Sequence, residues 1–293
     1  MGESLSTWTP SCNGAVRVEL SGQRTTSDSG ALLLREALDN SGVIEALEDN
    51  LVDFRNPLRI RHSLASQLRT LVLQRAMGWI DLSDTETLRR DPLWQLACSD
   101  ARGMTPLVQD RPSQATLSRL LTCLGRCDNI DAVHEGLLRL VIWRLTALKN
   151  GERPKQLTLD IDGLPIEVHG HQGGSAYHGL YGARIYSPLV ASLAETGDMV
   201  GGLLREGNAG PAENADTWIP HLVRRLNEST GAQVRVRIDA GFTDNATLEA
   251  LEECDIEYLG RLRSHSGLQK LAAPHLKRPP GRPPEQPREW CHD

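Results

Sequence analysis

The sequence predicts an α+β fold, with a mainly helical region over residues 1–150 followed by a domain with a mixed β-sheet over residues 151–263. In the first region apolar residues recur at helical spacing. After the turn cluster Asn150–Pro154 they fall at every second position, which is typical of half-buried strands. A proline-rich basic tail over residues 264–293 follows, and its prolines argue against a long helix there.

The helical region begins after a short expected strand at Ala15–Leu20. Ser27 or Asp28 can cap the first helix, whose amphipathic pattern continues to Leu51 and is broken by Pro57. Apolar stripes at helical spacing then mark three further helices. These are expected at 64–77, from Ser113 or Ala115 to about Arg126, and at Asp131–Leu148.

The second domain alternates strands and helices in the order β-β-β-α-β-α-β, with an aspartate ending the first and the fourth strand. That order is a ribonuclease H-like arrangement, in which strands far apart in the sequence pair in one mixed sheet. The expected strands are at 156–162, 184–193, 199–205, 234–239 and 257–262, and the expected helices at 214–227 and 245–253.

Composition narrows the class of protein. A hydrophobic content of 39% and a charged content of 24% are ordinary for a globular protein. The net charge of −6 argues against a general polyanion-binding surface, so any contact with nucleic acid must come from local basic patches. Six scattered cysteines predict reduced thiols and a cytoplasmic location. No apolar run reaches the roughly 18 residues of a membrane span.

Asp162 and Asp239 are the candidate catalytic residues. Each ends a run of alternating residues beside a glycine-containing turn, so each carboxylate points to the polar face of its strand. Carboxylates that end neighbouring strands can share a divalent cation. Two alternatives stay open at this point. An aspartate at a strand end is commonly a solvated turn residue, and Asp160 shares a strand face with Asp162.

Several ordered motifs make the chain resemble the DDE transposases of bacterial insertion sequences, with the thirteen-eighty family as the nearest branch. The resemblance covers about residues 17–263. The motifs that carry it are Thr26–Gly30, Arg61–Ser63, Leu88–Pro92, Gln114–Arg119, Leu159–Gly163, Val168–Gln172, Tyr186–Leu189, Thr196–Gly197, Leu204–Asn208 and Arg237–Phe242.

The resemblance implies a ribonuclease H-like catalytic domain that cuts and joins DNA with Mg²⁺ or Mn²⁺, two ions in a complete site. Asp162 and Asp239 match the family's two catalytic, metal-binding aspartates. The DNA is expected to be the terminal repeats of the insertion sequence and its target, bound by a homodimer in a synaptic complex. The family pattern next requires a glutamate on a helix, but Glu285 and Glu289 lie among prolines. We therefore expect a fragment, truncated at its C-terminus and inactive alone.

Arginines supply the candidate DNA contacts. Arg205 and Asn208 match a family block, although a solvated turn would give the same residues. Arg237 flanks Asp239 and either neutralises the carboxylates or grips a phosphate. Arg119 lies near the start of a helix that could enter a DNA groove or serve only as scaffold. DNA binding is expected mainly before residue 150, at Arg55, Arg59, Arg61, Arg69 and Arg119.

Other interpretations remain. Lys277–Pro284 resembles the Gly-Arg-Pro core of a minor-groove AT hook, or is a proline-rich linker. The whole chain could be a non-catalytic DNA-binding regulator of transposition or a decaying remnant. It could also be a ribonuclease H-like nuclease that completes its site with another carboxylate.

Overall fold

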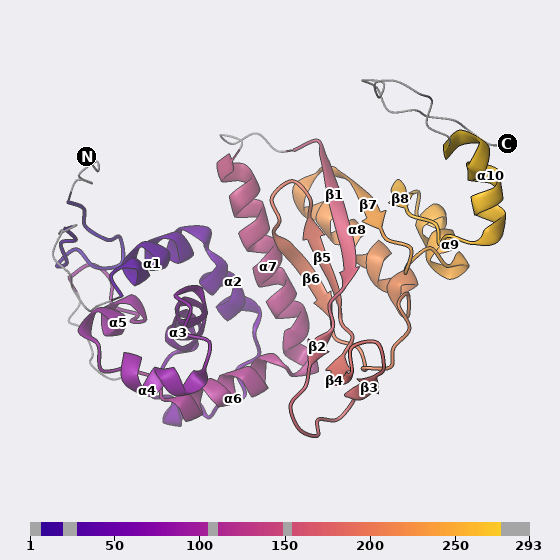
Figure 1. Ribbon diagram of the computed structural model, residues 1–293. Helices are drawn as coiled ribbons and strands as arrows, with labels where there is room; N and C mark the ends of the chain where they lie inside the picture. Colours follow the sequence, from indigo (N-terminus) through magenta and orange to yellow (C-terminus); the bar gives the residue numbers. More distant parts are fainter. Residues whose placement is uncertain (1–6, 20–27, 105–110, 149–153, 277–293) are drawn as a thin grey trace, which may run out of the picture.

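The computed structural model describes residues 7–19, 28–104, 111–148 and 154–276, and shows a helical region beside a mixed β-sheet (Figure 1). The α+β prediction is confirmed. The expected strand at Ala15–Leu20 is reduced to a single bridge between Trp8 and Val18, and Leu20 lies outside the described residues, as does Ser27. Within these ranges no helix is long and apolar enough to cross a membrane.

Gly42 divides the first expected helix into α1 (Gly30–Ser41) and α2 (Val43–Asn50). Its φ of 68° is left-handed, a conformation that favours glycine and ends a helix. Between the helices that the periodicity predicted, the structure has several short helical elements that the periodicity did not predict. In order, the helical region continues with η1 (Pro57–Arg59), α3 (Leu64–Ala76), η2 (Leu82–Asp84), α4 (Thr85–Leu88), α5 (Pro92–Ala97), α6 (Gln114–Leu124) and α7 (Cys127–Leu148).

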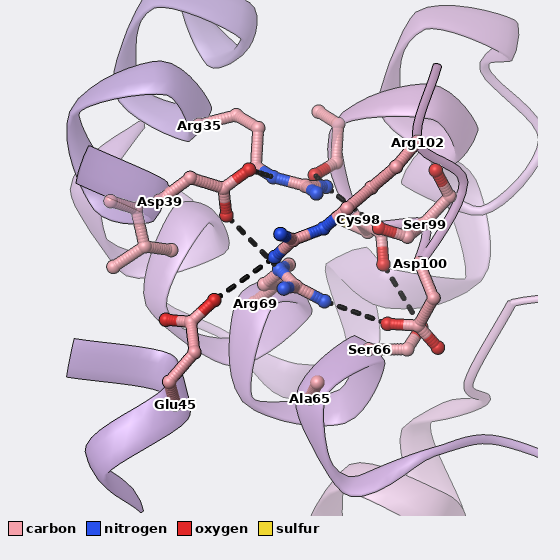
Figure 2. Close-up of polar contacts among 12 residues, drawn as sticks. Arg35, Asp39, Glu45, Ala65, Ser66, Arg69, Cys98, Ser99, Asp100 and Arg102 are labelled. Atoms are coloured by element: carbon pink, nitrogen blue, oxygen red, sulfur yellow. Dashed lines mark hydrogen bonds and ion pairs between the residues drawn. The ribbon is translucent and has the colours of Figure 1, made fainter. Parts of the chain in front are cut away.

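Two buried arginines tie the helical region together (Figure 2). Arg35 of α1 is fully buried; its Nε donates to Asp39 Oδ2 at 2.7 Å and its Nη1 to the carbonyls of Ala97 and Ser99, each at 2.7 Å. Arg69 of α3 donates to the other oxygen of Asp39 at 3.4 Å and to Asp100 at 2.7 Å. Asp39 therefore joins α1 to α3 through two buried cations.

We predict that Asp39→Asn lowers the free energy of unfolding by about 3 kcal/mol or more, because removing one member of a buried ion pair leaves uncompensated charge. Urea unfolding followed by circular dichroism measures this. The matched control is Asp49→Asn on the exposed side of α2, which should change stability by no more than about 0.5 kcal/mol. Equal effects of the two substitutions would contradict the role given to Asp39.

The large sheet has five strands in the order β6-β5-β1-β7-β8. Its central strand, β1, pairs antiparallel with β5 and parallel with β7. The strands are β1 (Gln156–Gly163), β5 (Leu189–Leu193), β6 (Met199–Leu203), β7 (Gln233–Ile238) and β8 (Tyr258–Gly260).

A second, three-stranded sheet of order β2-β4-β3 lies at the end of β1 that carries Asp162 (Figure 1). The strand expected at 184–193 is in fact two strands in different sheets. Pro188 lies between them, and a proline cannot donate a hydrogen bond to a continuous ladder. The other two strands are too short to show a period-2 pattern. The members are β2 (Ile166–Glu167), β3 (Ala176–His178) and β4 (Ala183–Tyr186).

One face of the large sheet packs against α7 and α8 (Ala215–Thr230) to form the second core. The buried side chains Leu138, Val141 and Leu145 of α7 belong to this core, whereas Ala132 nearer its start belongs to the helical core. One helix thus serves both regions, and a boundary at residue 150 would separate α7 from the strands on which it packs.

The C-terminal part departs from the prediction of no long helix beyond Ser264. The structure has α10 (Ser266–Leu276) after α9 (Asn245–Glu253). A helix can form here because Pro274 is the first proline in it, close to its end. A proline removes one hydrogen bond of the helix, the one that its own N–H would donate, and crowds only the turn before it. The later prolines lie outside the described residues.

Gly207 is where the loop after β6 meets the small sheet. A Cβ atom there would collide with the Ile185 carbonyl oxygen and would lie 2.5 Å from the Ala176 nitrogen. Only glycine, which has no Cβ atom, allows the loop backbone to lie this close to the backbones of β3 and β4. The backbone N–H of Gly207 also donates to the Gly174 carbonyl at 3.0 Å.

We predict that Gly207→Ala lowers the free energy of unfolding by about 3 kcal/mol, since backbone atoms must move to admit the methyl group. Thermal and urea unfolding provide the measurement. Gly179→Ala is the control, because a Cβ at Gly179 meets no atom within 4 Å. If the two variants are equally stable, the close approach at Gly207 does not constrain the fold.

Candidate active site

The candidate site lies where β1 and β7 end side by side. The two strands run parallel, with Asp160 opposite Arg237 and Ile161 opposite Ile238. Continuing this register by one residue places Asp162 beside Asp239, although the two residues are 77 positions apart (239 minus 162). The prediction that the two aspartates end adjacent strands is therefore confirmed. Both side chains are exposed.

Alternation along each strand separates the site from the core. Leu159 and Ile161 of β1 and Ile238 of β7 are buried among the α7 and α8 side chains. The residues between them face the opposite side of the sheet, because successive strand side chains alternate. The apolar core thus fixes the orientation of both aspartates.

A nearby backbone N–H binds one oxygen of each carboxylate. Asp162 Oδ1 accepts from the N–H of Gly163 at 2.7 Å, and Asp239 Oδ1 accepts from the N–H of Gly241 at 2.7 Å. A Cβ at Gly241 would lie 2.9 Å from Asp239 Oδ1, so glycine keeps this close turn open. Each carboxylate thus uses one oxygen locally, which leaves the other oxygen available to a ligand.

Asp160 is the less suitable metal ligand of the first strand. Its Oδ2 accepts from Arg237 Nη2 at 2.5 Å, and its Oδ1 is buried without a hydrogen-bond partner in the described structure. The hydrogen bond that Arg237 donates to Asp160 raises the pKa of Arg237, with the carboxylate's charge as a second cause. Arg237 therefore neutralises Asp160, one of the two roles expected for it, and Asp162 keeps its place at the strand end.

The structure corrects the expectation that Arg205 approaches DNA phosphates. Its side chain is only 5% exposed, and its guanidinium donates to the carbonyls of Ser187, Gly210, Pro211 and Glu213 at 2.7–3.0 Å. Burial lowers its pKa, and the nearby Glu213 partly opposes that shift. A guanidinium occupied by four carbonyls is structural, and it fixes the loop that leads into α8.

We predict that Arg205→Lys lowers the free energy of unfolding by about 2 kcal/mol or more, because a lysine ammonium cannot reach carbonyls on two sides as the planar guanidinium does. Differential scanning fluorimetry measures the loss. Arg224→Lys, at an exposed position of α8, is the control and should leave stability nearly unchanged. A DNA affinity that falls while stability stays the same would restore the original interpretation of Arg205.

The remaining expected DNA contacts are dispersed. Asn208 lies on the loop after β6, and Arg119 is exposed on α6 in the helical region. Arg69 is buried in ion pairs and is removed from the DNA-binding set. Glu285, Glu289 and the Lys277–Pro284 motif lie outside the described residues.

Sequence reasoning missed the cleft next to Asp239. A cavity of about 600 Å³ lies between the turn after β7 and the loop before α8, and its walls include Asp216, Asp244 and Arg263. Arg263 Nε donates to the carbonyl of Ala240 at 2.8 Å, which ties the segment after β8 to the turn. No sequence pattern marks these residues, because they come from segments that are far apart in the sequence and meet only in the folded chain.

The oxygen donors at Asp162 and Asp239 suit a hard cation such as Mg²⁺, which takes one or two protein carboxylates and keeps several waters. Among the described residues no group of three or more His, Cys, Asp or Glu side chains could hold a metal ion. Two such carboxylates could supply part of the oxygen ligands of one ion, with waters supplying the rest.

Comparison of the sequence with known families identifies the family of this chain. The family described as "Transposase DDE domain group 1" matches residues 9–292, nearly the whole chain. The chain belongs to this DDE transposase family. DDE transposase domains generally use a divalent metal, which agrees with the oxygen donors at the ends of β1 and β7. No curated protein matches the chain.

One solved structure is similar to this DDE chain, a cryo-EM structure of a piggyBac transposase synaptic complex with hairpin DNA. The two are 14% identical, and the match covers 89% of this chain and 48% of the piggyBac chain, with a TM-score of 0.33. The chain thus spans about half the length of that protein. A TM-score this low does not establish a common fold, and the family assignment depends on the sequence match alone.

Proposed function

We propose that the chain is a DDE transposase of a bacterial insertion sequence, in the thirteen-eighty family, that holds Mg²⁺ between Asp162 and Asp239 and does not cut DNA by itself. The observation that carries this proposal is the parallel β1–β7 pairing, because Asp162 and Asp239 each directly follow its last residue pair, Ile161 and Ile238, and both are exposed. The family match supplies the class of reaction. Its place of action is the bacterial cytoplasm, where the DNA is.

The sheet supports a ribonuclease H-like assignment for the catalytic domain. Numbered along the large sheet alone, β1, β5, β6, β7 and β8 stand in the spatial order 3-2-1-4-5. The first three strands form an antiparallel meander, and the last two add in parallel through helical crossovers. The carboxylates occupy the central strand and its parallel neighbour.

The residues have separate roles in this proposal. A Mg²⁺ ion would supply Lewis-acid activation of water and of the scissile phosphate. Asp162 and Asp239 would hold it, because their turns fix one oxygen each. Asp160 lies two residues before Asp162 on the same sheet face, and its ion pair with Arg237 keeps its carboxylate from binding the ion. The DNA would be the ends of the insertion sequence and the target, bound by a homodimer.

Metal binding tests the site directly. We predict that Mn²⁺ binds the full chain, as measured by electron paramagnetic resonance. Asp162→Asn or Asp239→Asn should weaken this binding at least about tenfold, because loss of an outer-shell partner already lowers metal affinity by that much and loss of a direct ligand should lower it more. Asp255→Asn, in the exposed turn after α9, is the charge-matched control. Unchanged Mn²⁺ binding in both site variants would refute the assignment of these aspartates.

A second candidate function is a non-catalytic regulator that occupies insertion-sequence ends. It is favoured by one observation: within the described parts of the chain, no third carboxylate joins Asp162 and Asp239 in a metal-binding group. Loss of one member of a catalytic unit removes most of its rate. Such a chain would bind DNA without cutting it and would compete with a complete transposase.

Strand cleavage tests whether the metal site is complete in this chain. We predict that the purified 293-residue chain does not cut or join insertion-sequence-end DNA in Mg²⁺ or Mn²⁺. Denaturing gels of end-labelled duplexes would show this. Cleavage that disappears in Asp239→Ala and persists in Asp255→Asn would show instead that the chain completes its own site, and it would exclude the regulator.

A further inference from the structure

An arginine-rich groove in the helical region, remote in sequence from the aspartates, brings together four of the five arginines that the sequence suggested as DNA contacts. It has a volume of about 620 Å³ and lies between η1 with the loop after it, the start of α6, and the α4–α5 segment. No acidic residue lines it in the described part of the chain. Six of its lining residues are arginines: Arg55, Arg59, Arg61, Arg89, Arg111 and Arg119.

Four of these arginines, Arg55, Arg61, Arg89 and Arg111, have partners within the protein. Arg55 binds Asp53 with Nη2 at 2.6 Å, and this hydrogen bond lowers the pKa of Asp53. Arg89 pairs with Glu86 at 3.3 Å. Arg111 is buried and donates to the Gln95 carbonyl at 2.7 Å. These contacts shape the wall of the groove, and the carboxylates of Asp53 and Glu86 stay outside its lining.

Arg59 and Arg119 differ from the others. Both are exposed, and within residues 7–19, 28–104, 111–148 and 154–276 neither takes part in an ion pair. Arg59 sits on a protruding 3₁₀ turn whose neighbouring residue, Leu58, is 95% exposed. Arg119 is on the solvent side of α6, two residues beyond the buried Leu117. Two such guanidinium groups facing one hollow repel each other unless an anion lies between them.

A second hollow of about 280 Å³ continues the groove and shares Arg55, Gln67, Thr116 and Arg119 with it; Asp53, which pairs with Arg55, lines this second hollow. It exposes an aromatic face. Phe54 is 48% exposed, and the Arg126 guanidinium stacks over its ring at 3.9 Å. Basic side chains beside an exposed aromatic ring are typical of surfaces that bind nucleic acid.

We propose that this arginine groove holds the sugar–phosphate backbone of DNA, with Arg59 and Arg119 as its phosphate contacts. The inference rests on the proposed function for its ligand, but the position of the groove comes from the structure alone. The chain carries a net charge of −6, so its surface as a whole does not attract a polyanion. The arginines gathered in one hollow give a local positive potential that does. Neutral hydrogen-bonding groups between the arginines, on Asn56, Ser113 and Thr116, suit phosphate oxygens.

Figure 1 shows α4, α5 and α6 on one side of α7 and strands β1 and β7 on the other, and residues on and next to these helices line the groove. A duplex that reaches both must cross α7, the helix that packs into both cores. Because that helix sets the distance between the groove and the aspartates, the groove would fix where along the DNA the aspartates act.

The test is a salt titration of DNA binding by the full chain. Fluorescence anisotropy with a labelled random-sequence duplex gives the affinity at each salt concentration. Arg59→Gln/Arg119→Gln should lower the affinity about tenfold or more at low salt. The slope of log K against log salt should become shallower by about two units, because each phosphate that an arginine neutralises contributes about one unit to that slope.

Arg75→Gln is the matched control, because Arg75 is exposed on α3 outside the groove; this variant should keep both the affinity and the slope. Circular dichroism and thermal unfolding of all variants should match the starting chain. Glutamine keeps helix propensity close to that of arginine, so α6 should be retained.

The other possible results contradict either the proposed function or the DNA-binding role of the groove. If the unsubstituted chain binds no duplex at any salt concentration, the proposed function fails. If it binds and the double variant keeps the same slope, the groove is not where DNA binds and the inference is wrong. Binding of poly-glutamate that exceeds binding of DNA, and that the double variant loses, would identify an acidic protein as the partner and would also overturn the inference.

Discussion

The parallel pairing of β1 with β7 is the constraint on which the candidate site depends. Parallel strands cannot be joined by a tight turn, so the chain between them must leave the sheet and return through a crossover. Here that connection contains the small sheet, β5, β6 and α8. The apolar residues of both strands are buried under α7 and α8. A slip of one residue would turn those side chains to solvent and move the aspartates into the core.

The small sheet and the loop before α8 support this arrangement. Arg205 binds carbonyls on both sides of the loop, and Gly207 allows that loop to touch the edge of the small sheet. Both residues act at a distance from the aspartates. Their effect is to set where α8 begins, and α8 in turn covers the buried face of β1 and β7.

The helical region depends on a different kind of interaction. Its buried Arg35 and Arg69 meet a shared carboxylate, and such pairs fix a geometry more than they add stability, since desolvation offsets much of the attraction. Cys98 lies in the same interior, where burial raises its pKa to about 12 and leaves it an unreactive thiol. The rigid frame built this way carries the arginine groove on its outer side.

The sequence by itself determined the α+β class, most helix positions, and Asp162 and Asp239 as the ends of adjacent strands. The helices and the two strand ends follow from local information: a period of 3.6 or 2, a cap, or a glycine beside a strand end. That the two strands are neighbours was inferred from the order of strands and helices along the chain. The family resemblance added the class of reaction, and the family match confirms it. The third carboxylate of the site and the ribonuclease H-like assignment remain proposals.

Tertiary structure decided what each arginine does. Arg205, Arg69, Arg119 and Arg59 are indistinguishable by local pattern, yet the first two are buried among carbonyls and carboxylates and the last two are exposed beside a groove. It also divided the expected strand at 184–193 between two sheets and gave α7 to both cores. The physical reason is the same in each case: burial and ion pairing depend on segments distant in the sequence, and spacing along the chain does not encode them.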